Sequence, residues 1–165
     1  MKIKNKSIFA LLVIFVLTAS VAAIYAETAS VGSLSFEVPD GITVVNTTDT
    51  QITMRNTDGD EIVIDDELSS GVSAGDYLES HGYSYDSSFS VDRTSYGADG
   101  SDASSYSYTI EQYSGNGYAF LYVFDVDGEE HTIIAYTDTL DDTSATAMLG
   151  DQVDGADDIM DAIMK

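Results

Sequence analysis

Three alternating segments separated by two tight-turn dipeptides constrain the fold of this 165-residue chain more than any other feature. Asn116-Gly117 and Asp127-Gly128 are dipeptides that two-residue hairpin turns favour, because the central residues of such turns need positive φ. The segments around them alternate side chains with the period of two that a β-strand requires, and they cover residues 105–113, 118–124 and 131–136. These segments predict an antiparallel meander of three strands.

The first half of the chain carries the same kind of signal in shorter segments. Asp58-Gly59 predicts one hairpin turn and Pro39-Asp40-Gly41 predicts another. The predicted strands beside these turns cover residues 34–38, 42–45, 51–56 and 61–64. A further short strand at residues 89–93 is predicted within a stretch, residues 83–104, that is rich in Ser, Gly and Asp.

Two helices complete the prediction. The first covers residues 73–82, with Ser73 as its N-cap and Gly82 as its C-terminal stop. The second follows Asp154, the expected N-cap, and buries Ile159, Met160 and Ile163. Strands followed by helices predict an α+β fold, in which an antiparallel β-sheet of hairpins and a meander carries a mid-chain helix and a C-terminal helix.

The N-terminal segment predicts export. Lysines at positions 2, 4 and 6 precede an uncharged apolar run over residues 8–24, and small residues follow it. This order is typical of a secretory signal cleaved after Ala23 or, preferably, after Ala26. The alternative is an uncleaved anchor over residues 8–26, which is nearly long enough to span a bilayer. Both alternatives place the remainder outside the membrane, in the extracellular space or at the cell surface.

The predicted domain organisation follows from these boundaries. Residues 1–26 form the signal peptide or membrane anchor, residues 27–32 a linker, and residues 33–165 a single acidic α+β domain. Membrane contact is expected only through the N-terminal segment.

Composition excludes several classes of function. After residue 26, three basic residues stand against all 29 acidic ones, a net charge of −26. Such a domain repels polyanions, so we expect no nucleic-acid partner. The chain has no cysteine, which excludes disulfides, thiol catalysis and cysteine-ligated metal centres.

The segment Phe36-Glu37-Val38-Pro39-Asp40-Gly41 resembles the F-x-V-P-x-G opening of the PsbP/DcrB-like domain family. In that family the opening leads into hairpins, a mid-chain helix, a meander and a packed terminal helix, which is the order predicted here over residues 33–165. The chain also resembles small exported archaeal proteins with this layout. The roles found in the family are photosystem accessory subunit, small-GTPase binder and envelope lipoprotein. The resemblance therefore implies a non-enzymatic accessory or binding role and provides no catalytic residues.

Acidic residues gather at the second hairpin turn of the meander. Asp125, Asp127, Glu129 and Glu130 place carboxylates on one loop, and calcium favours several oxygen ligands on flexible loops. The spacing fails the EF-hand register, because the twelfth position from Asp125 is Tyr136. Turn chemistry is the alternative explanation for these residues.

Gly71-Val72-Ser73-Ala74-Gly75 matches the G-x-S-x-G nucleophile pattern. That motif requires a buried strand that ends directly at the serine. Several acidic and serine residues intervene here, so an N-cap role for Ser73 is preferred and a hydrolase is only the third hypothesis. Asn46-Thr47-Thr48 is a glycosylation sequon.

Tyrosines are the remaining candidates for binding. Those in the meander are expected in the core, whereas four near predicted loops are better surface candidates: Tyr83, Tyr85, Tyr96 and Tyr113. The sequence thus predicts an exported, non-catalytic accessory or binding domain whose partner is a protein or envelope component. It predicts no cofactor, with a calcium-responsive surface protein as the alternative.

Overall fold

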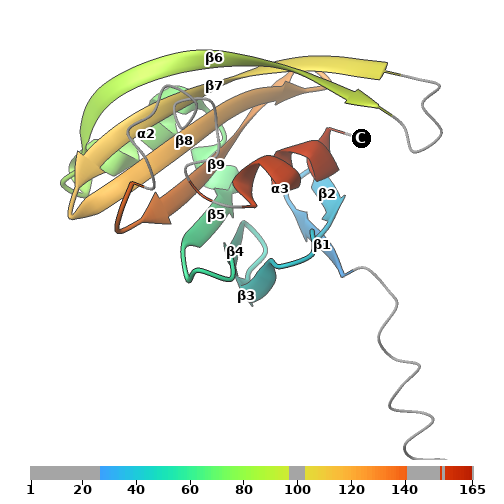
Figure 1. Cartoon of the computed structure of the whole chain (residues 1–165), viewed down its shortest axis with the longest axis horizontal. Coiled ribbons are helices and arrows are strands. Elements are labelled where there is room, and N and C mark those ends of the chain that lie inside the picture. Colours follow the sequence, from blue (N-terminus) through green and yellow to red (C-terminus); the bar gives the residue numbers. More distant parts are fainter. Residues whose placement is uncertain (1–26, 97–102, 141–152, 154, 165) are drawn as a thin grey trace, which may run out of the picture.

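The computed structural model describes residues 27–96, 103–140, 153 and 155–164. It contains a seven-stranded sheet, a separate two-stranded hairpin and one longer helix against each face of the large sheet (Figure 1). All strand pairs are antiparallel. The predicted α+β class is therefore confirmed. The predicted signal segment and the expected cap Asp154 lie outside the described residues.

Twelve elements are described in the chain. In order they are β1 (Thr28–Val31), β2 (Leu34–Glu37), β3 (Thr43–Thr47), β4 (Gln51–Arg55), β5 (Glu61–Asp65), the 3-10 helix η1 (Asp66–Leu68), α2 (Gly71–Ser80), β6 (Ser84–Tyr96), β7 (Ala103–Gly115), β8 (Gly117–Val126), β9 (Glu129–Thr137) and α3 (Ala156–Ile163).

The large sheet has the strand order β3-β4-β5-β9-β8-β7-β6. The predicted three-strand meander is present as β7, β8 and β9, and its second turn has the positive φ values of 56° at Asp127 and 87° at Gly128. The last strand of the meander also pairs with β5, where Ile62 lies opposite Ala135. This pairing joins the two halves of the chain into one sheet.

One face of the sheet, called here the α3 face, is covered by α3 and by the β1–β2 hairpin (Figure 1). Alternate residues of β8, such as Phe120 and Tyr122, point into this core. They meet Ile159 and Met160 of α3 and Phe36 of β2 in one buried cluster. The predicted apolar stripe of the terminal helix is thus confirmed at its first two residues, and Ile163 is partly buried.

The opposite face, called here the α2 face, has a smaller core under α2. Ala119 and Leu121 of β8 and Ile134 of β9 pack there against Ala74 and Leu78 of the helix. Tyr113 also lies in this core, so its prediction as a surface residue was wrong. Because a single helix of ten residues covers this face, the side chains of β4 and β5 remain partly exposed on it.

Two boundaries differ from the prediction. Residues 28–31 form β1, paired with β2, and are not a linker, because Ala29 and Val31 bury their side chains in the α3-face core. The serine-rich stretch forms the strand β6 over residues 84–96, much longer than the predicted 89–93. Serine favours strands only weakly, and β6 is extended because it pairs with β7 along nearly its whole length.

The terminal helix is held to the long β6–β7 hairpin by a polar network. Arg93 of β6 binds the carboxylate of Asp157, and its other terminal nitrogen lies 3.7 Å from the carboxylate of Asp161. Tyr108 donates a hydrogen bond of 3.0 Å to Asp157, and Tyr106 donates one to Asp161. The helix begins after Gly155, its N-cap residue, which has φ of 86°.

Candidate binding cleft beside helix α2

Helix α2 is fixed in place by caps at both of its ends. At the start, Ser70 is the N-cap, and it forms a capping box with Ser73. At the other end, Gly82 has φ of 87°, and the backbone N–H of Tyr83 donates to the carbonyl of Leu78. This Schellman arrangement turns the chain sharply and places Tyr83 next to the end of the helix. The predicted stop at Gly82 is confirmed, but the predicted N-cap was three residues too late.

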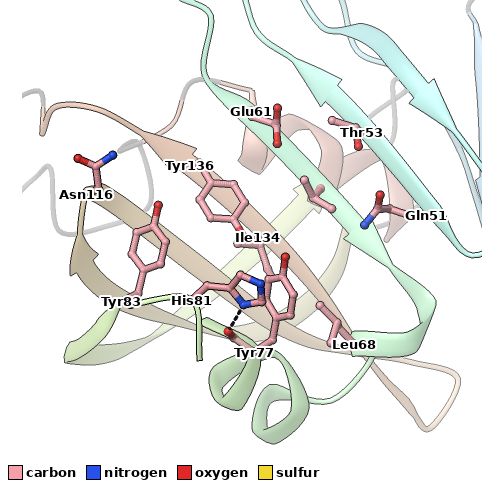
Figure 2. A pocket seen from close by; sticks show the side chains of 12 residues that line it. Gln51, Thr53, Glu61, Leu68, Tyr77, His81, Tyr83, Asn116, Ile134 and Tyr136 are labelled. Carbon is pink, nitrogen blue, oxygen red and sulfur yellow. Dashed lines mark hydrogen bonds between the residues drawn. The ribbon is translucent and has the colours of Figure 1, made fainter. Parts of the chain in front are cut away.

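A cleft of about 750 Å³ opens between α2 and the uncovered part of the sheet (Figure 2). It is bounded by α2 and the chain just after it, by β4, β5 and β9, and by the β7–β8 turn. Its lining residues are Gln51, Thr53, Glu61, Val63, Leu68, Tyr77, His81, Gly82, Tyr83, Asn116, Ile134 and Tyr136.

Two pairs of rings dominate the lining. Tyr83 and Tyr136 lie with their ring centroids 5.9 Å apart at an angle of 53°, and Tyr77 and His81 lie 4.1 Å apart at 32°. The Nδ1 atom of His81 is 2.8 Å from the carbonyl oxygen of Tyr77, which fixes the orientation of the imidazole. Between the two pairs, Ile134 provides an apolar floor (Figure 2).

Apart from the rings, the polar groups that line the cleft are amides, one hydroxyl and one carboxylate. Glu61 lies directly opposite Tyr136 in the β5–β9 pairing, so the carboxylate and the ring are neighbours on the α2 face. At the rim, Arg55 reaches Glu61 with a separation of 3.6 Å between its Nη2 atom and Oε2. Gln51 donates a hydrogen bond of 2.9 Å to Asp65. Burial, and then the nearby groups Tyr77, Tyr83 and Glu61, raise the pKa of Tyr136, so its phenol is neutral.

Alkaline titration is expected to destabilise the fold through its buried phenols. Burial is the main cause that raises the pKa of each of four tyrosines: Tyr106, Tyr108, Tyr113 and Tyr136. Because the folded pKa exceeds the unfolded value of about 10, this stabilisation is complete below about pH 10 and is lost as the pH rises further.

Tyrosinate absorbance measured together with circular dichroism checks this expectation. In urea the tyrosines should titrate together, whereas in the folded protein part of the absorbance change should appear at higher pH and coincide with unfolding. Identical titration curves in the two conditions would contradict it.

Ser73 has a structural role in the capping box. Its hydroxyl donates to the Ser70 carbonyl at 3.0 Å and accepts the Ser70 backbone N–H at 3.3 Å. His81 lies at the other end of α2, about 12 Å along the axis at 1.5 Å per residue. His131 is buried on the α3 face, against Phe124. Neither histidine is therefore placed to activate Ser73.

Removing the true N-cap is expected to cost more than removing Ser73. Ser70→Ala should lower the free energy of unfolding by about 1 kcal/mol, because the backbone N–H of Ser73 in the first turn loses its acceptor. Ser73→Ala removes the bonds that the Ser73 hydroxyl makes with the Ser70 backbone but leaves the Ser73 N–H bound to Ser70 Oγ, so it should cost less. Urea unfolding of both variants measures this difference. A larger loss in Ser73→Ala, or loss of an esterase activity with the fold intact, would contradict the capping role.

Two carboxylates of the acidic β8–β9 turn accept hydrogen bonds from backbone N–H groups of the protein. Asp125 accepts a hydrogen bond of 2.8 Å from the backbone of Gly128, and Glu130 accepts one of 2.8 Å from the backbone of Gly71 at the start of α2. Asp127 and Glu129 are exposed. Within residues 27–96, 103–140, 153 and 155–164, no group of three or more His, Asp or Glu side chains is arranged to hold a metal ion.

Only one of the predicted surface tyrosines, Tyr83, lines the cleft. Tyr85 is 48% exposed but lies near Tyr113 on the other side of α2, and the side chain of Tyr96 is not among those described. Asn46, the predicted glycosylation site, is exposed on the edge strand β3. Sequence reasoning missed Tyr136, Tyr77 and Glu61 as site residues, because only the β5–β9 pairing and the position of α2 bring them together.

No protein-family model matches the sequence, and no curated protein matches it. Across the part of the chain that the structure describes, none of the helices combines the length and the apolar character needed to cross a membrane.

Proposed function

We propose that the protein is an exported, non-catalytic binding domain, exposed outside the membrane, whose ligand occupies the cleft beside α2. The observation that carries this proposal is the incomplete cover of the sheet. Because only α2 covers this face, the α2-face side chains of β4 and β5 are not covered by another element. Together with the Tyr83–Tyr136 and Tyr77–His81 ring pairs they line a space that has the size of a small-molecule site.

The chemistry of the lining supports binding rather than catalysis. Its polar groups are amides, phenols, one hydroxyl, one carboxylate and the imidazole of His81, whose Nδ1 atom lies against the Tyr77 carbonyl. Ser73, the residue that resembles a nucleophile, is used in the helix cap. The resemblance to PsbP/DcrB-like domains agrees with an accessory or binding role. The N-terminal signal pattern supports export to the cell surface or beyond it.

The net charge narrows the class of ligand and partner. A domain with a net charge of −26 disfavours nucleic acids, acidic polysaccharides and anionic membrane surfaces. An envelope component or small molecule that is neutral or positively charged fits this surface better. Ions that merely screen the acidic exterior, calcium included, would act on the whole surface and not on the cleft.

Backbone-amide NMR of the natively exported protein tests the proposal. The probes are maltotriose, choline, citrate and calcium chloride, each added separately, and saturable shifts centred on Tyr83, Ile134 and Tyr136 are expected for at least one of the first two. Val63→Trp, which fills the cleft, should abolish these shifts. Val72→Trp, at a position 77% exposed and outside the cleft, should not. Saturable shifts confined to the β8–β9 turn with calcium, and none at the cleft, would overturn the proposal.

A further inference from the structure

We propose that the cleft beside α2 binds an organic ammonium ion, of which a quaternary ammonium group is the simplest form. This inference rests on the proposed binding function of the cleft and assigns the chemical class of its ligand.

The rings of the cleft provide the first part of the argument. Tyr77, Tyr83 and Tyr136 all line one space, and they extend into it from α2, from the chain just after α2 and from β9 (Figure 2). The faces of aromatic rings attract a cation within about 6 Å of the ring centroid, and groups of such rings are the usual site for quaternary ammonium ligands. The 5.9 Å separation of the Tyr83 and Tyr136 centroids allows one cation to contact both rings.

The single carboxylate of the cleft provides the second part. Glu61 lies beside Tyr136, so a cation held by the ring is also close to a negative charge. No lysine or arginine is among the residues that line the cleft. Of the two arginines that the structure describes, Arg93 is bound to α3 on the opposite face of the sheet, and Arg55 contacts Glu61 at the rim. The cleft is thus electrostatically suited to cations.

The apolar floor provides the third part. Ile134 and Val63 lie opposite each other in neighbouring strands and form a patch without hydrogen-bonding side-chain groups. A primary ammonium ion would lose hydrogen bonds to water on this patch, whereas N-methyl groups pack against it without that loss. The floor therefore favours a methylated ammonium group over a simple amine.

The position of Arg55 predicts competition. The guanidinium of Arg55 forms an ion pair with the Glu61 carboxylate at 3.6 Å. The side chain of Arg55 is 50% exposed and that of Glu61 is 43% exposed. A bound cation that approaches Glu61 must share the carboxylate with Arg55 or displace it. Arg55→Gln is therefore expected to strengthen binding of a cation, and Glu61→Gln is expected to weaken it.

Titration of the natively exported protein with choline and with 3,3-dimethylbutan-1-ol separates charge from shape. The second compound has the shape of choline but carries no charge. Followed by amide NMR, choline should bind at the cleft at least about ten-fold more tightly, a difference of about 1.4 kcal/mol. Glu61→Gln should weaken choline binding several-fold and leave binding of the alcohol unchanged. Added salt should weaken only choline binding.

Ring variants test the aromatic contribution. Tyr136→Phe keeps a ring in place and should retain choline binding, whereas Tyr136→Leu should lose most of it. Tyr77→Leu is a second test that does not depend on a buried site, because Tyr77 is 37% exposed. Circular dichroism and urea midpoints verify that each variant is folded.

The possible outcomes distinguish this inference from the proposed function. Equal affinity for choline and the uncharged alcohol, or cleft binding of maltotriose without that of choline, would overturn the ammonium inference and leave the cleft as a binding site. Absence of cleft shifts with every probe would overturn both proposals. Choline binding that depends on Glu61 and on the rings would support both.

Discussion

Arg93→Met is expected to lower the free energy of unfolding by about 2–3 kcal/mol, because it leaves the buried carboxylate of Asp157 without its cation. Asp157 is only 8% exposed, and Arg93 is the basic residue that joins it to the β6–β7 hairpin. The hydrogen bond from Tyr108 remains but cannot replace a positive charge. Urea unfolding with an unchanged m-value measures the loss.

The second described arginine provides a matched control. Arg55 also pairs with a glutamate, but both side chains are exposed, so Arg55→Met should change the free energy of unfolding by less than about 1 kcal/mol. The double variant Arg93→Met with Asp157→Asn should recover part of the loss, because the amide carries no buried charge and keeps an acceptor for the Tyr108 hydroxyl. Equal losses in the two arginine variants would show that the α3 network contributes no more than a surface salt bridge.

Phe120→Ala is expected to produce the largest loss of stability, about 3–5 kcal/mol. Phe120 is 1% exposed and lies in the centre of β8, where it packs in the same cluster as Ile159 and Met160 of α3. Truncation removes the buried ring and leaves a cavity between the sheet and the helix. Thermal and urea unfolding measure the effect, which is a large part of the total stability of an ordinary domain.

Leu121→Ala and Val45→Ala complete this comparison. Leu121 points to the α2 face and is fully buried, so its truncation should cost about 2–5 kcal/mol. Val45 is 53% exposed on the edge strand β3, and its truncation should stay within about 0.5 kcal/mol. Leu121 packs with Leu78 of α2 in one buried cluster, which is why a large loss is expected. A small effect of Leu121→Ala would contradict this prediction and would mean that α2 contributes little to the stability of the sheet.

The parts of the fold that were predictable depend on local signals. At Asp127-Gly128, two residues that tolerate positive φ stand between segments whose side chains alternate with the period of two of a β-strand. Both the turn and its two strands are found where they were expected. The stop of α2 at Gly82 is local in the same sense, since it depends on one backbone conformation. The N-cap was misplaced because Ser70 and Ser73 both fit a capping box, and only the folded chain distinguishes them.

The parts that were missed depend on contacts distant in sequence. Residues 28–31 and 84–96 have the small and polar composition of linkers, and partner strands make them extended. The cleft is missed for the same reason. Glu61 and Tyr136 become neighbours only because β5 pairs with β9, and no spacing within either strand reveals that pairing.

The pairing of β5 with β9 also has a consequence for how the chain is built during synthesis. Ile62 meets Ala135 at a sequence separation of 73 residues, so β5 cannot find its final neighbour until β9 has been made. A nascent or prematurely terminated chain that ends before Glu129 leaves β5 and β8 each with an unsatisfied edge. Completion of the large sheet is therefore a late event, and hydrogen exchange on growing chains should show the β5 amides that face β9 protected only after β9 has emerged.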